Sequence, residues 1–253
     1  MDYSFDKVFD FSGKVALITG GANGIGKCIA ELYAERGATL VLVDRIEKVH
    51  ETASALGSQH LSWVGDVSDE DSVKSIVSGT VEKLGHIDIL INSAGIGPLD
   101  KAEDTSVDLW DLTMAVNLRG SFLYAREVGK QMIKQKSGRI INMASQAALV
   151  ALDGHLAYCA SKAGILGMTR VQAMEWGQHG ITVNAISPTV VETEMGAQGS
   201  WAGERGEIFK SKMPVGRFAQ PQEIAHAALY LTSGASGMIT GENLVIDGGY
   251  TAL

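Results

Sequence analysis

The stretch that decides the fold is VALITGGANGIG, residues 15–26. Residues 15–19 form a short apolar run that predicts a buried strand, and four glycines follow within residues 20–26. Glycine lets a turn approach a ligand closely, and the helix predicted from about residue 24 offers N–H groups and a partial positive charge at its N-terminus. The pattern predicts a pyrophosphate site. Tight strand-to-helix turns also use glycine for steric reasons alone, so other residues must decide.

Asp44 ends the next apolar run, roughly 20 residues beyond the last glycine of the turn. A carboxylate at this place can accept hydrogen bonds from both adenosine ribose hydroxyls, which favours NAD. The 2′-phosphate of NADP would meet like charge at Asp44, and Asn23 brings no cation to the turn. Arg45 is the nearby counterargument, and the plain alternative is that Asp44 merely ends a strand on a polar residue.

Apolar runs alternate with longer amphipathic stretches along the whole chain. The predicted strands are residues 15–19, 40–44, 61–64, 87–92, 139–144, 181–186 and 244–247. The predicted helices are residues 24–37, 69–85, 106–136, 157–178 and 221–233. Because the strands are apolar on both faces, we expect a doubly wound parallel sheet of the Rossmann type, with helices on both faces.

No linker or repeat divides the sequence, so residues 1–253 are expected to form a single domain. One stretch, residues 189–220, is rich in glycine and carries no clear periodicity. We predict that it is an irregular, flexible lid near the site.

Composition excludes several classes of partner. A net charge of −8 without a basic stripe argues against nucleic acid, and no run approaches the ~18 apolar residues of a membrane span. Cys28 and Cys159 lie far apart without metal-type spacing, and an acidic N-terminus is unlike an export signal, which together favour a reducing cytoplasm. The six histidines show no metal-ligand spacing, so no catalytic metal is expected.

Tyr158 and Lys162 lie four residues apart in a predicted helix, so their side chains share one face. A phenol has a pKa near ~10, and a neighbouring cation favours phenolate. The pair can therefore exchange a proton with an alcohol. Taken alone, such a pair is more often a surface feature than a catalytic one.

Several ordered motifs now resemble the short-chain dehydrogenase/reductase family over nearly the whole chain. The glycine turn at 19–26 is similar to the family's phosphate motif, Asp66-Val67 to its adenine-contacting pair, and residues 92–95 to the segment under the cofactor. The family's catalytic tetrad is matched by Asn117, Ser145, Tyr158 and Lys162.

The resemblance implies a role for each member of the tetrad. Tyr158 would exchange the proton of the substrate oxygen, and Ser145 would hold that oxygen by a hydrogen bond. Lys162 would bind the nicotinamide ribose and lower the pKa of Tyr158, while Asn117 would hold a water linking Lys162 to solvent. Alone, Ser145 could be a strand-end serine and Asn117 a helix-kink amide.

The resemblance also implies the cofactor contacts. They are Gly20, Asn23, Gly24, Ile25, Gly26, Asp44, Asp66, Val67, Asn92, Ala94, Gly95, Tyr158, Lys162, Pro188, Val191 and Thr193. Two positions depart from the family: Pro188-Thr189 stands where Pro-Gly is usual, and Asn92-Ser93 where Asn-Asn is common. The contacts at residues 188–191 are therefore in doubt, because a β-branched residue restricts the backbone.

The substrate expected is a secondary alcohol or ketone, with residues 193–195 and 245–251 resembling the family's sugar-alcohol and diol dehydrogenases. Gln146 and His155 could form hydrogen bonds with a polyol. The alternative for His155 is a polar loop residue without a role in binding. Three apolar residues of the predicted lid, Trp201, Phe209 and Met213, predict that one wall of the substrate site is apolar. The alternatives are an NADPH-dependent ketoacyl-type reductase and a non-catalytic NAD-binding regulator.

The resemblance further implies self-association. Residues 106–136 and 157–178 correspond to the helices that pair subunits in the family, so a homotetramer or dimer is expected. Leu166, Met174 and Trp176 are predicted to be core or subunit-interface residues.

Overall fold

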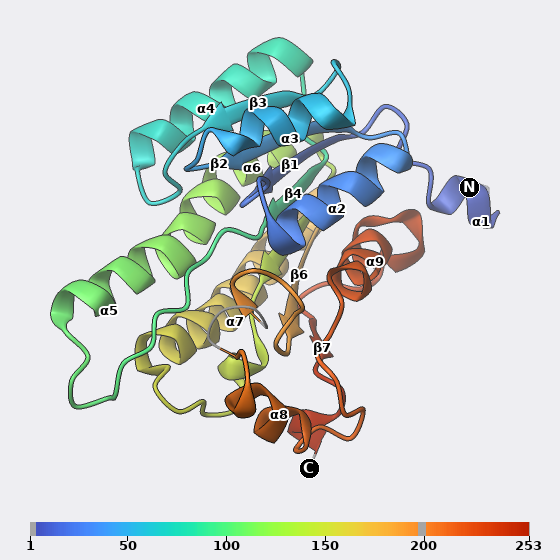
Figure 1. The fold of residues 1–253 in the computed structure, drawn as a ribbon. Helices are drawn as coiled ribbons and strands as arrows, with labels where there is room; N and C mark the ends of the chain where they lie inside the picture. Colours follow the sequence, from blue (N-terminus) through green and yellow to red (C-terminus); the bar gives the residue numbers. More distant parts are fainter. Residues whose placement is uncertain (1–3, 197–200, 253) are drawn as a thin grey trace.

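A single parallel sheet forms the centre of the molecule (Figure 1). The computed structural model describes residues 4–196 and 201–252. Seven strands lie in the order β3-β2-β1-β4-β5-β6-β7, and every neighbouring pair is parallel. They are β1 (Val15–Thr19), β2 (Thr39–Asp44), β3 (Leu61–Val64), β4 (Ile89–Asn92), β5 (Gly138–Met143), β6 (Ile181–Pro188) and β7 (Asn243–Ile246). The predicted doubly wound sheet is confirmed.

Helices cover both faces of the sheet. They are α1 (Phe5–Val8), α2 (Gly24–Glu35), α3 (Lys48–Leu56), α4 (Glu70–Leu84), α5 (Val107–Met114), α6 (Gly120–Gln135), α7 (Leu156–Trp176), α8 (Glu204–Lys210) and α9 (Pro221–Thr232). Helices α2, α3 and α9 share one apolar core with the sheet, and α4, α6 and α7 share another on the opposite face. Burial on both sides explains why the strands read as continuous apolar runs.

The strand order reverses between β1 and β4, and this reversal positions the site. From β1 the chain builds outward through β2 to β3, then returns to add β4 to β7 on the other side. The helices therefore diverge at the carboxyl ends of β1 and β4, where Thr19 and Asn92 are register partners. Ligands of such sheets bind in the crevice at this switch point.

The helix predicted over residues 106–136 is interrupted. Helix α5 ends at Met114, a π-helical turn spans Ala115–Arg119, and α6 continues from Gly120. Asn117 lies inside this turn and is fully buried. Turns of this kind are frequent at functional sites because the extra residue changes where side chains point.

Three helices, α1, α3 and α8, are absent from the expectations drawn from periodicity. Helix α3 has few apolar residues, of which Val49 and Ala53 are buried. The prediction of an irregular segment over residues 189–220 is wrong for α8, whose Phe209 packs in a buried cluster with Val190, Met213 and Phe218. Tertiary packing stabilises this short helix, so local periodicity does not reveal it.

Strand β4 starts two residues later than predicted, although Ile87 is fully buried. The side chain of Gln135 accepts from the Ile87 N–H at 3.2 Å and donates to its carbonyl at 3.0 Å. A side-chain amide at the end of α6 therefore replaces the strand ladder at this residue.

Candidate active site

The glycine turn after β1 has the backbone geometry that only glycine tolerates. Gly20 and Gly24 have φ of +70° and +54°, and a Cβ built on Gly26 would lie 2.2 Å from the Gly20 carbonyl oxygen. Helix α2 begins directly at Gly24, and the Asn23 side chain does not cap it. First-turn N–H groups of α2, including that of Ile25, are thus available to a phosphate, which fits the pyrophosphate of a dinucleotide.

At the end of β2 the structure places charges of both signs beside this turn. Asp44 Oδ2 accepts a hydrogen bond from the Ala22 N–H at 3.1 Å, and Oδ1 receives none from the described residues. Lys48, at the start of α3, donates to Asn23 Oδ1 at 2.6 Å. Arg45 is the one nearby cation expected from the sequence, and the structure adds Lys48, which reaches the turn from the unpredicted helix α3.

The loop after β4 is held against the glycine turn by one hydroxyl. Thr19 Oγ1 accepts from the N–H groups of Ser93 and Ala94 at 3.1 and 3.2 Å. A Cβ on Gly20 would lie 3.0 Å from the Ala94 backbone, so the two segments are in close contact. Asn92 points the other way, with its Nδ2 donating to Asn142 Oδ1 at 2.9 Å inside the sheet.

Asp66 and Val67 lie beyond the end of β3, on the α6 side. Asp66 Oδ1 accepts from the Ser68 N–H and hydroxyl at 2.8 and 2.7 Å. Val67 is buried against the start of α6, where a Cβ on Gly120 would lie 2.8 Å from its side chain. Val67 therefore packs in the apolar core on the opposite face of the sheet from Ala22 of the glycine turn.

Ser145, Tyr158 and Lys162 come together at the carboxyl end of β5. Ser145 precedes a short 3₁₀ turn and accepts from the Ala147 N–H at 3.1 Å. Tyr158 and Lys162 lie on successive turns of α7, with the Lys162 Nζ 5.6 Å from the phenol ring centroid. A Cβ on Gly95 would lie 3.6 Å from that Nζ, which joins the catalytic side chains to the segment after β4.

Desolvation governs the acid–base properties of this pair. Desolvation raises the pKa of Tyr158 above its ordinary value. A hydrogen bond with Ser145 acts in the opposite direction but is the smaller effect. Desolvation also lowers the pKa of Lys162 to about 8. Lys162 donates to the Met143 carbonyl at 2.7 Å. The expected lowering of the Tyr158 pKa by Lys162 stays a prediction.

Asn117 ties three elements together from the π-helical turn. Its Oδ1 accepts from the Ile96 N–H at 2.8 Å, and its Nδ2 donates to the Ile96 carbonyl at 2.9 Å and to Ser161 Oγ at 3.1 Å. The loop after β4 and the catalytic helix α7 are thereby held at a fixed spacing.

The segment after β6 closes the other side of the crevice. Thr189 directly follows β6, and its N–H donates to the Ile246 carbonyl at 2.9 Å, so the residue that departs from Pro-Gly is still hydrogen-bonded to β7. Pro188 pairs with the same residue, and Val191 is buried. A Cβ on Gly24 would lie 3.5 Å from the Thr193 methyl, so the structure brings Thr193 over the glycine turn.

Gln146 and His155 are both buried. In the sequence, Gln146 follows Ser145 directly and His155 lies three residues before Tyr158. Neither amide atom of Gln146 has a hydrogen-bond partner among the described residues. The His155 ring lies 5.8 Å from the Tyr158 ring, edge to face. Trp201 from the lid stacks on His155 at 5.7 Å with an interplanar angle of 13°. Trp201 was expected only as part of an apolar wall, and this stack was not foreseen.

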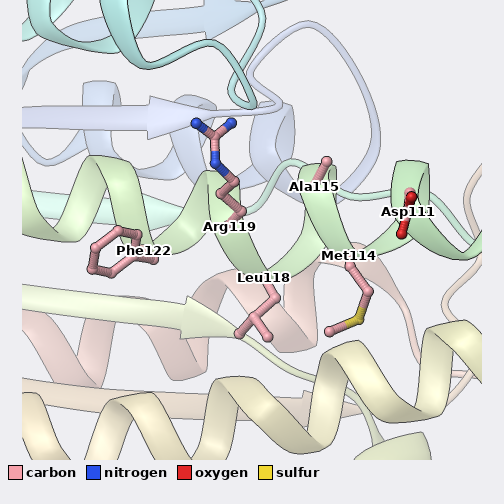
Figure 2. Close-up of a pocket in the computed structure, with 6 residues that line it drawn as sticks. All are labelled: Asp111, Met114, Ala115, Leu118, Arg119 and Phe122. Atoms are coloured by element: carbon pink, nitrogen blue, oxygen red, sulfur yellow. The ribbon is translucent and has the colours of Figure 1, made fainter.

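A separate pocket of about 420 Å³ lies on α5 and α6 (Figure 2). Its lining residues are Asp111, Met114, Ala115, Leu118, Arg119 and Phe122. None of them is a predicted catalytic or cofactor residue, and the lining is mostly apolar. Over residues 4–196 and 201–252 no cluster of three or more His, Cys, Asp or Glu side chains could hold a metal ion. Within the same residues, no helix is long and apolar enough to span a membrane.

Comparison with known proteins agrees with this geometry. Residues 20–251 match the family described as "Enoyl-(Acyl carrier protein) reductase". The "NAD-dependent glycerol dehydrogenase" of Listeria innocua is 51% identical over 98% of this chain and 97% of its own length. The "D-threitol dehydrogenase" of Mycolicibacterium smegmatis is 50% identical over 99% of this chain and 97% of its own.

Solved structures show the same fold. A short-chain type dehydrogenase/reductase from Mycobacterium marinum superimposes with a TM-score of 0.94 and 34% identity, over 99% of this chain and 100% of its own. The chain belongs to the short-chain dehydrogenase/reductase family, and it is an oxidoreductase of that family.

Proposed function

We propose that this protein is an NAD-dependent dehydrogenase that interconverts a small polyol or vicinal diol and the corresponding ketone. The observation that carries the proposal is the convergence of Ser145, Tyr158 and Lys162 with Gly95 at the switch point of the sheet. The names of the two relatives that share half of the sequence support a polyol substrate.

The residues divide the chemistry among themselves. A nicotinamide held beside Tyr158 and Lys162 would supply the acceptor for the hydride from the carbinol carbon. Tyr158 takes the proton of the substrate hydroxyl during oxidation and returns it during reduction. Ser145 holds the same oxygen by a hydrogen bond, which orients the substrate. The hydroxyl therefore loses a proton and the carbon a hydride, leaving the ketone.

Lys162 and Asn117 take part in proton exchange with solvent, and Lys162 also binds the nicotinamide ribose. With a pKa near 8, the Lys162 ammonium can exchange a proton close to neutral pH. We place the nicotinamide ribose hydroxyls against Lys162 and a relay water beside Asn117. The hydrogen bonds of Asn117 to Ile96 and Ser161 would hold this proton-exchange route next to the Tyr158 phenol.

The remaining cofactor contacts follow the crevice. Gly20, Gly24, Ile25 and Gly26 would hold the pyrophosphate, and Asp44 the adenosine ribose. Asp66 and Val67 would contact the adenine, and Val191 and Thr193 the carboxamide. The remaining cofactor contacts proposed are Asn23, Asn92, Ala94, Gly95 and Pro188. The single domain over residues 1–253 and the flexible substrate lid around residues 189–220, of which residues 197–200 lie outside the described residues, belong to the same proposal.

The test is a panel of alcohols with both nicotinamide cofactors, read by the ultraviolet absorbance of the reduced cofactor. We expect NADH to form from glycerol or threitol, and NADPH to form much more slowly. Cofactor binding without turnover of any alcohol would instead support the non-catalytic regulator.

One observation favours a second candidate, an NADPH-dependent ketoacyl-type reductase. Lys48 stands beside the glycine turn, where its ammonium could pair with a 2′-phosphate. Asp44 opposes this candidate through like charge. Preference for NADPH with a ketoacyl thioester in the same panel would decide for it.

We further propose a cytoplasmic homotetramer, with a dimer as the smaller unit. Leu166 is buried in the core, whereas Met174 is 76% exposed on α7. Other large apolar side chains are exposed on α5, α6 and α7: Val107, Leu112, Phe122 and Val171. Val107, Leu112 and Phe122 lie on α5 and α6, which also carry the pocket of Figure 2, and this exposed apolar surface suits a second copy. Light scattering at working concentration tests this, and a monomer would contradict it.

A further inference from the structure

His155 is held firmly beside the catalytic phenol. It immediately precedes α7, one helical turn before Tyr158, and is only 5% exposed. Its backbone forms an isolated β-bridge with Asp100, from the loop after β4. The two rings meet edge to face at 5.8 Å. The imidazole is therefore within reach of a substrate whose reacting oxygen lies on Tyr158.

The tautomer of His155 follows from its one hydrogen bond. Nδ1 lies 2.9 Å from the Asp153 carbonyl oxygen, which can only accept, so Nδ1 carries the hydrogen. Burial lowers the pKa of His155, so the neutral ring prevails and Nε2 holds a lone pair. No described residue hydrogen-bonds to this atom. The site thus contains an acceptor that the protein leaves without a donor.

Trp201 covers the face of this imidazole. The planes of the two stacked rings are nearly parallel, with 5.7 Å between centroids. Arg205 lies over Trp201 at 4.5 Å and donates to the same Asp153 carbonyl at 3.3 Å. Phe209 supports Trp201 from α8 with centroids 4.5 Å apart. Contacts from the lid therefore fix the ring, and only its edge remains to receive a ligand.

We infer that His155 Nε2 accepts a hydrogen bond from a second hydroxyl of the substrate, one or two carbons from the reacting carbinol, and that Trp201 closes this subsite. The inference deepens the proposed function and rests on it. An acceptor without a donor is costly to desolvate, so an alcohol with a single hydroxyl binds poorly in its transition state. His155 is then the residue that distinguishes a polyol from a simple secondary alcohol.

The test compares alcohols that share a carbon skeleton: glycerol against propan-2-ol, and threitol against butan-2-ol. The measured quantity is the ratio of kcat/KM for the polyol to that for the monoalcohol. In His155→Leu we expect this ratio to fall about 10-fold to 100-fold, because the acceptor is lost. His155→Gln keeps an acceptor at a similar distance and should recover much of the ratio. An unchanged ratio in His155→Leu would overturn the inference.

Control variants separate recognition from folding. His226→Leu on α9 removes an exposed histidine far along the chain and should leave the ratio unaltered. Thermal unfolding and NADH binding confirm that each variant is folded. Trp201→Ala should lower the ratio in the same direction as His155→Leu, while Trp201→Phe retains the stack and much of the ratio. If both Trp201 variants match the wild type, the role of the lid is refuted.

Failure of this inference is distinguishable from failure of the proposed function. Wild-type protein that oxidises no polyol overturns both, and this appears before any variant is made. Wild-type protein that oxidises polyols, with a ratio insensitive to His155, overturns only the inference.

Discussion

The two sides of the crevice are built in different ways. The side of β1 and β2 uses backbone geometry within one short stretch, where Gly20, Gly24 and Gly26 shape the turn. The side of β5 to β7 uses side chains from distant segments, such as His155, Trp201 and Phe209 in one aromatic stack. The first arrangement suits a cofactor that is the same in all relatives. The second suits a substrate that differs among relatives.

The difference also concerns rigidity. Around the glycine turn, a Cβ built on Gly20 would lie 3.0 Å from the Ala94 backbone, so the two segments leave no space for a side chain. On the substrate side, Trp201 is held by a ring stack on His155 and by Arg205 lying 4.5 Å from its ring centroid. We expect substitutions on the cofactor side to act on binding and folding together, and those on the substrate side to act on selectivity. Four predictions test this division between the cofactor side and the substrate side.

Removing the phenol hydroxyl should have the largest effect. Tyr158→Phe is expected to lower kcat by about 1,000-fold or more, because the transferable proton is lost. NAD affinity should stay within a few-fold, since the ring and the glycine turn are untouched. Steady-state rates and cofactor fluorescence measure the two quantities. Substantial residual turnover would show that another group carries the proton.

Filling the glycine turn should come second. Gly26→Ala places a methyl group 2.2 Å from the Gly20 carbonyl, so the turn must move. We expect NAD affinity to fall by about 100-fold and the thermal midpoint to drop by several degrees, as steric strain of this kind costs a few kcal/mol. Gly177→Ala is the matched control, because no atom lies within 4 Å of its built Cβ. Equal behaviour of the two variants would contradict the close-approach argument.

Changing the charges at the ribose end should alter selectivity rather than catalysis. Asp44→Ala is expected to weaken NAD by about 10-fold to 100-fold and NADP much less, because hydrogen-bond acceptors and a repulsive charge disappear together. Lys48→Met should act in the opposite sense and weaken NADP more than NAD. Binding titrations with both cofactors measure this. Parallel losses for both cofactors would remove the argument from Asp44.

The pH profile should show the raised pKa of Tyr158. Oxidation needs the deprotonated phenol, so a pKa raised by desolvation makes the oxidation rate climb with pH, by about tenfold per unit below the pKa. Reduction needs the protonated phenol and should stay level over the same range. Initial rates in both directions from neutral to alkaline pH measure it. An oxidation rate that is flat across that range would show that bound cofactor reverses the effect of desolvation.

Much of the cofactor side was predictable from the sequence, because its signals are local. The glycine turn, Asp44 and the Tyr158–Lys162 spacing each lie within one strand, turn or helix, and the structure places them around one crevice. Lys48 was missed because α3 has little apolar periodicity, although a lysine soon after Asp44 was a usable signal. The irregular lid was a wrong expectation for α8, which depends on Phe209 packing in a distant cluster.

The amino-acid order by itself determined the parallel sheet, the phosphate turn and the types of residue that carry the proton, because backbone sterics and residue spacing are properties of neighbouring residues. Only the tertiary structure decided that burial raises the Tyr158 pKa, that Asn117 sits in a π-helical turn, and that Trp201 covers His155. Desolvation and stacking depend on which segments meet in space, and segments far apart in the chain meet only when the whole sheet has formed.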